Sequence, residues 1–217
     1  MGILAAIGIG LLIPAAEQLG FLIRYCLMAM LFFSFLEVRF SCQLLQRAHL
    51  VVVVLNLALP LVVGQQAEVE ALTVAMPVIS IIFLPLLASL ALRWAWPAAA
   101  TRIQRYSGYS FSLFLFNVFV AAASASHFAR GEGSSALGLF FGIGLAVALL
   151  CLFQFRLGER IGRPGRMIDV GLSLGRKNTM FGIWLALTFI SPVAALGPMY
   201  YILFQNLYNS WQMYRMQ

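Results

Sequence analysis

Long apolar segments follow one another through nearly the whole sequence, separated by short polar connections. A helix needs about 20 apolar residues to cross the hydrocarbon core of a bilayer, and eight segments come close to this length or exceed it. They cover residues 2–16, 20–38, 48–64, 71–94, 107–128, 135–155, 168–190 and 194–213. The sequence therefore predicts an all-α polytopic membrane protein with about eight transmembrane helices.

The small number of charged residues supports the same class. Only 10% of the 217 residues are charged, while 62% are hydrophobic. A soluble domain carries about 25% charged residues, because its surface must be hydrated. Strand-length segments of alternating polarity, typical of an outer-membrane barrel, are absent. We therefore expect a single transmembrane domain over residues 1–217, with the lipid bilayer as its solvent.

Basic residues alternate from one connection to the next, which predicts the orientation of the chain. Ten arginines follow the second, fourth, sixth and eighth segments, whereas Arg130 alone lies in the opposite loops. Because basic loops stay in the cytoplasm, both termini are expected to be cytoplasmic. This distribution accounts for the net charge of +7, so no nucleic-acid partner is predicted. We expect an integral protein of the bacterial inner (plasma) membrane.

Segment 168–190 is the one that plain hydrophobicity does not explain. Arg176 and Lys177 are adjacent within it, and a charge at the centre of a span costs about 2.5–3.5 kcal/mol on insertion scales. The alternative is a span that begins at Asn178, with the two cations as ordinary anchors. Residues 178–190 would then rise only about 20 Å, which is too short to cross. The basic pair is therefore expected to lie at some depth, in a water-filled cavity or beside a bound anion.

Glycines interrupt the same segment, at Gly171, Gly175 and Gly182. Glycine-interrupted polar stretches are typical of the broken helices with which transporters form a site near the midplane. The segment therefore supplies most of the candidate substrate-binding residues: Ser173, Arg176, Lys177, Asn178 and Thr179.

Polar residues of two other segments complete the candidate site. Gln205 and Asn209 are four residues apart and share one helical face, with Asn206 beside them. Asn117 is the fourth such residue and lies in segment 107–128. The alternative for each of the four is a hydrogen bond that holds neighbouring helices together.

Motifs for catalysis and for metal binding are absent. The sequence shows no His/Asp/Ser grouping, no metal-ligand spacing and no phosphate-binding loop. We therefore predict that the protein is not an enzyme and that it uses no metal and no cofactor.

The C-terminal part, GRKNTMFGIWLALTFISPVAALGPMYYILFQNLYNSW (175–211), resembles the last two helices of the bile acid:sodium symporter family. Residues 10–41 look like the first two helices of that family, and residues 102–132 and 135–155 look like its seventh and eighth. The resemblance implies two inverted repeats that form panel and core parts, with discontinuous crossing helices at the centre of the core. It also implies alternating-access transport of an organic anion, usually driven by sodium.

The chain departs from the family pattern in two ways. It is shorter, and the fourth and fifth helices of the family are missing. Residues 1–64 would be a remnant of the first repeat, and 65–217 would be the second repeat with its crossing helix at 168–190. The resemblance also implies sodium ligands at the positions of Ser173 and Lys177, where the family has glutamate and glutamine.

Two functions follow from these observations. The first is secondary transport of a small organic anion without sodium coupling, because the ammonium group of Lys177 would repel sodium. The second is a non-transporting reduced homologue or assembly partner, for which a homodimer would fill the positions of the missing helices.

Overall fold

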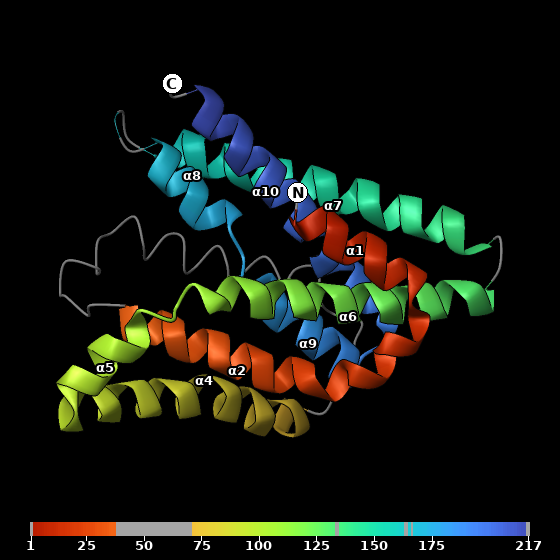
Figure 1. The fold of residues 1–217 in the computed structure, drawn as a ribbon. Coiled ribbons are helices and arrows are strands. Elements are labelled where there is room, and N and C mark those ends of the chain that lie inside the picture. The colour runs from red at the N-terminus through yellow and green to blue at the C-terminus, as the bar shows by residue number, and fades with distance from the viewer. Residues whose placement is uncertain (1, 38–70, 133–134, 163–164, 166, 216–217) are drawn as a thin grey trace. The chain divides into compact units, whose positions relative to one another are not determined.

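The structure is a computed structural model that describes residues 2–37, 71–132, 135–162, 165 and 167–215. Every regular element among these residues is helical (Figure 1). The elements are α1 (Gly2–Leu12), the 3-10 helix η1 (Pro14–Gly20), α2 (Phe21–Glu37), α4 (Ala71–Ala95), α5 (Pro97–Gln104), α6 (Tyr109–Glu132), α7 (Ser135–Ile161), α8 (Met167–Gly175), α9 (Thr179–Phe189) and α10 (Pro192–Arg215).

Four of the described segments are long and apolar enough to cross a membrane: Pro14–Glu37, Thr73–Ala95, Tyr109–Gly131 and Gly138–Ile161. Large apolar side chains on these helices are exposed, with Leu84 at 58%, Phe141 at 75% and Leu149 at 60%. A soluble protein rarely leaves long helices covered by such side chains in water. The prediction of an all-α protein with membrane-spanning helices is therefore confirmed for the described residues.

The observed helices differ from the predicted segments at several ends. Pro14 ends the first helix at Leu12 and opens η1, since proline favours the first position of a helix. Helix α7 continues six residues beyond the predicted end at 155, because Arg156, Glu159 and Arg160 are good helix formers outside an apolar run as well as within one. The predicted segment 48–64 lies outside the described residues.

The chain divides into two compact units, each with its own packing. The first holds α1, η1, α2, α4, α5, α6 and residues 180–195, and the second holds α7, α8 and α10 from Leu196 onward. The boundary between the units falls after Thr179, at the start of α9.

In the first unit, α1 packs closely against α6 (Figure 1). Gly10 allows this approach, because an added Cβ there would meet the carbonyl oxygen of Phe119 and would lie 2.8 Å from the Cβ of Ala122. Ser126 Oγ of α6 donates a hydrogen bond to the carbonyl of Leu11 at 2.8 Å, which satisfies a free group at the end of α1.

In the second unit, α7 and α8 lie side by side with their backbones in close contact (Figure 1). An added Cβ on Gly158 would lie 2.8 Å from the Cα of Gly171, and one on Gly175 would lie 2.5 Å from the ring of Phe155. Gly171 and Gly175 form a G-x-x-x-G pattern, which lets membrane helices approach each other closely. Phe155 in turn stacks on Tyr208 of α10, with ring centroids 4.3 Å apart.

We predict that Gly175→Ala destabilises the protein by about 1–3 kcal/mol, because the new methyl group overpacks the contact with Phe155. Gly165 is the glycine of the described residues that has a positive φ, so alanine fits the backbone at position 175 and the cost is steric. The measurement is thermal unfolding in detergent micelles.

Gly142→Ala is the matched control, since an added Cβ on this α7 glycine meets nothing within 4 Å. Adding Phe155→Leu to Gly175→Ala should restore part of the lost stability. Equal unfolding temperatures for the two alanine variants would contradict the close approach of α8 to Phe155.

Candidate functional site

The predicted interruption of segment 168–190 is present as a break between two helices. The last hydrogen bond of α8 runs from the backbone N–H of Arg176 to the carbonyl of Leu172, at 2.9 Å. Residues 176–178 are not helical, and α9 begins at Thr179. A break of this kind leaves backbone donors and acceptors without their helical partners.

The first of these groups is the backbone N–H of Lys177, which in a continuous helix would bind the carbonyl of Ser173. It instead donates to Oε1 of Gln205, at 3.2 Å. Gln205 is 8% exposed, so this hydrogen bond is shielded from water. The predicted site residues Lys177 and Gln205 are therefore in contact, through the backbone of one and the side chain of the other.

The second group is the carbonyl of Gly175, which accepts a hydrogen bond from the hydroxyl of Tyr201 at 2.6 Å. The same hydroxyl lies 2.8 Å from Oε1 of Gln154. A tyrosine hydroxyl has one proton to donate, and the two ends of a glutamine amide are interchangeable by rotation. All three groups are satisfied when Nε2 of Gln154 donates to Tyr201 and Tyr201 donates to Gly175.

Positive charge gathers at the break. Arg176 and Lys177 carry two cations, and Asn178 separates them from Thr179, the first residue of α9. Guanidinium and ammonium groups form charge-assisted hydrogen bonds with carboxylates and phosphates. Chemically, the break can hold a carboxylate or a similar small anion by charge and by hydrogen bonds.

The other predicted site residues have different surroundings. Ser173 Oγ donates to the carbonyl of Asp169 at 2.7 Å, and Asn206 Nδ2 donates to the carbonyl of Ile202 at 2.7 Å. Both bonds stay within one helix, where they support neither a ligand nor a second helix. Asn178 and Thr179 adjoin the basic pair along the chain.

Two of the predicted asparagines have buried side-chain oxygens without a hydrogen-bond partner. In α10 this atom is Oδ1 of Asn209. In the first unit it is Oδ1 of Asn117 on α6, whose Nδ2 lies 4.0 Å from the sulfur of Met30. Asn117 and the remaining site residues belong to different units.

Tyr201 and Gln205, which bind the break, belong to a stripe of four hydrogen-bonding side chains on one face of α10. Tyr201, Gln205, Tyr208 and Gln212 recur at helical spacing, and each is at most 8% exposed. The sequence pattern identified Gln205 on this face but paired it with Asn209. The sequence pattern did not identify Tyr201 or Gln154. Each could have been recognised as a polar side chain within an otherwise apolar segment.

The C-terminal half of this stripe binds Glu159 of α7, which the sequence analysis did not identify. Oε1 of Glu159 accepts hydrogen bonds from the Tyr208 hydroxyl at 2.8 Å and from Nε2 of Gln212 at 2.7 Å. Nε of Arg156 donates to the Tyr208 oxygen at 3.1 Å. This network joins α7 to α10 about one helical turn beyond the break's own partners.

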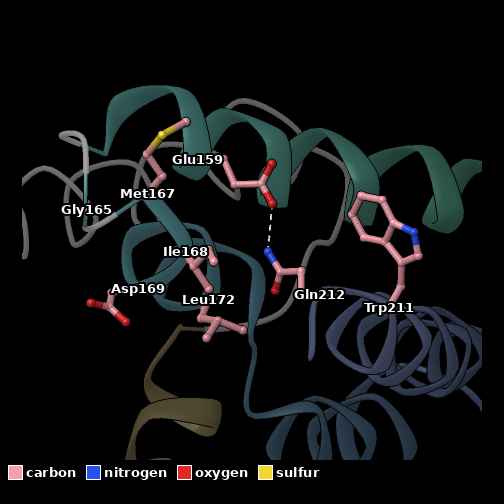
Figure 2. Close-up of a pocket in the computed structure, with 8 residues that line it drawn as sticks. All are labelled: Glu159, Gly165, Met167, Ile168, Asp169, Leu172, Trp211 and Gln212. Carbon is pink, nitrogen blue, oxygen red and sulfur yellow. Dashed lines mark hydrogen bonds between the residues drawn. The ribbon is translucent and has the colours of Figure 1, made fainter. Parts of the chain in front are cut away.

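A pocket of about 630 Å³ opens beside this network. Figure 2 shows the residues that line it, with Glu159 bonded to Gln212 across one wall. Glu159 and Asp169 are its charged lining residues, and both are acidic. None of the predicted site residues lines this pocket. Its two carboxylates would repel the anion that the basic pair at the break would attract.

The described residues contain no group of three or more His, Cys, Asp or Glu side chains that could hold a metal ion. No protein-family model, curated protein sequence or solved structure matches this chain. The break and its partners in α7 and α10 are the features of the described residues that bear on function.

We predict that Tyr201→Phe destabilises the protein by about 1–3 kcal/mol, since it leaves a buried carbonyl without a donor. The structure around the break should also become less stable locally, so backbone amides at residues 176–180 should exchange with deuterium faster than in the wild type. Thermal unfolding in detergent and hydrogen-exchange mass spectrometry measure the two effects.

Tyr200→Phe is the matched control, because its ring stacks on Phe204 of the same helix and its hydroxyl makes no hydrogen bond within the described residues. If both tyrosine variants unfold and exchange alike, Tyr201 does not support the break.

Proposed function

We propose that this chain is a transporter-like membrane protein that binds a small organic anion at the break between α8 and α9. The observation that carries the proposal is a helix that stops at a basic pair while its freed backbone groups are bound by buried side chains. Discontinuous helices with this pairing of free backbone and charge are used by secondary transporters for ionic substrates.

The roles of the residues follow from their chemistry. Arg176 offers a planar, bidentate donor for a carboxylate, and Lys177 offers a mobile point charge. Asn178 and Thr179 would orient the anion by neutral hydrogen bonds. Gln205 holds the backbone of Lys177 and is therefore a positioning residue.

The finer architecture is part of the same proposal. It has about eight transmembrane helices in the arrangement of the bile acid:sodium symporter family, with residues 168–190 as the crossing helix and both termini in the cytoplasm. The break, the G-x-x-x-G contact of α8 and the basic end of α7 support it.

Lys177 is proposed to take the place of the coupling ion. An ammonium group and a sodium ion a few ångströms apart repel each other strongly in a medium of low dielectric constant. Ser173 would also be a poor replacement for a carboxylate ligand, since its hydroxyl is bound to its own helix. Anion binding and transport should therefore be independent of sodium.

We predict that the purified protein is stabilised thermally by at least one small organic anion, equally in sodium and in potassium buffers. A ligand that binds the folded state at a concentration of 100 Kd adds about 2.7 kcal/mol to its stability. Lys177→Ala should remove most of this stabilisation, since the charge that attracts the anion is lost. The measurement is thermal unfolding in detergent with a panel of carboxylates and sulfonates.

Arg102→Ala is the matched control, because Arg102 is an exposed cation of α5 in the other unit. It should respond to the anion as the wild type does. Stabilisation that requires sodium would contradict the role given to Lys177. The absence of any response to any anion would favour the second function, a non-transporting homologue or assembly partner, and a homodimer would then be expected.

A further inference from the structure

A second pocket in the same unit is a groove along α7 and α10, with a volume of about 390 Å³. Its walls are mostly apolar and come from both helices: Ala148, Cys151, Leu152, Phe204 and Leu207. Arg156, Tyr208 and Trp211 line it as well and lie toward the C-terminal ends of these helices. One end of the groove is therefore apolar, and the other is cationic and aromatic.

One wall of the groove is formed by α7, whose segment Gly138–Ile161 is long and apolar enough to cross a membrane. Ala148, Leu152 and Arg156 recur every four residues and so share one face of α7. Between the first and the last of them the helix rises about 12 Å, a length that suits part of an acyl chain. Leu152 and Leu207 remain 47% and 65% exposed, so the groove is open on its outer side.

Arg156 contacts three side chains: Tyr208, Glu159 and Trp211. Its Nε donates to the Tyr208 hydroxyl at 3.1 Å, and the same nitrogen lies 3.9 Å from Oε2 of Glu159. The centre of its guanidinium group lies 5.7 Å from the ring centroid of Trp211. These contacts use Nε and one face of the group, whereas the terminal nitrogens make no hydrogen bond within the described part of the chain.

The guanidinium group of Arg156, whose side chain is 59% exposed, is accessible to a phosphate. Two terminal N–H donors can bind two phosphate oxygens side by side, which is the preferred geometry of arginine with this anion. Arg160 follows one turn later on the same face of α7 and is exposed. Two cations therefore stand against the single carboxylate of Glu159, whose Oε1 already accepts two hydrogen bonds.

We propose that the groove binds an anionic phospholipid, with its phosphate on Arg156 and one acyl chain along Cys151, Phe204 and Leu207. A basic position between membrane helices, at the level of the headgroups, is where anionic lipids bind specifically. Tyr208 and Trp211 belong to the aromatic residues that favour this interfacial level. The site is separate from the break and does not depend on anion transport.

The test uses native mass spectrometry of the detergent-purified full chain with added dioleoyl phosphatidylglycerol or dioleoyl phosphatidylcholine. The wild type should retain phosphatidylglycerol at concentrations at least about tenfold lower than phosphatidylcholine, as expected when one charge-assisted phosphate contact decides binding. Arg156→Gln should remove this preference, and Arg102→Gln and Lys177→Ala should keep it. Leu152→Trp fills the apolar end without changing the charge, and it should weaken the binding of both lipids.

Three results would overturn the proposal. One is a preference for phosphatidylglycerol that is absent in the wild type or unchanged in Arg156→Gln. Another is stabilisation of the protein by glycerol 1-phosphate at the concentrations at which the lipid acts, since the acyl chain would then contribute nothing. The third is a dimer that dissociates in Leu152→Trp while lipid retention stays unchanged, because a second copy of the chain would then occupy the groove.

Discussion

The hydrogen bond from the Tyr201 hydroxyl to the carbonyl of Gly175 is the interaction on which the second unit depends. A helix that stops among apolar side chains leaves polar backbone groups that water cannot reach, and each such group costs about 1–3 kcal/mol if it stays unpaired. Tyr201 and Gln205, one turn apart on α10, bind a freed acceptor and a freed donor of the break. The backbone of the break is therefore hydrogen-bonded without water, and the peptide group at the start of the basic pair is bound to α10.

Close backbone contact between α7 and α8 makes this arrangement possible. Gly158, Gly171 and Gly175 remove the side chains that would separate the two helices, and Phe155 fills the space beyond them, stacked on Tyr208. Polar side chains of α10 then reach both helices: Tyr201 and Gln205 reach the break, and Tyr208 and Gln212 reach Glu159. The same packing orients Arg156 toward the outer groove, so the break and the proposed lipid site share one framework.

Local sequence patterns predicted the long apolar helices of the described residues, but not the short α5, which is amphipathic rather than apolar. They predicted the break because Gly175 and the polar residues after it are adjacent in the chain. The partners of the break were not predictable in the same way. Gln154 and Tyr201 are separated by 47 residues, and their meeting depends on how α7 and α10 pack. A hydroxyl or amide group can also form a hydrogen bond within its own helix or with another segment. Ser173 and Asn206 bind their own helices, whereas Gln205 binds the break, and the sequence does not distinguish these cases.

The depth of Lys177 in the membrane tests the account most directly. A spin label at Lys177→Cys, in a protein whose Cys26, Cys42 and Cys151 are replaced by alanine, can be compared in nanodiscs with a label at Arg160→Cys. Power saturation with oxygen and with a water-soluble nickel chelate reports depth and access to water. If the basic pair lines a water-filled site within the membrane, the label at 177 lies deeper than the label at 160 and is still reached by the chelate. Equal depth at the two positions would show an ordinary interfacial anchor and would contradict a charged site within the membrane.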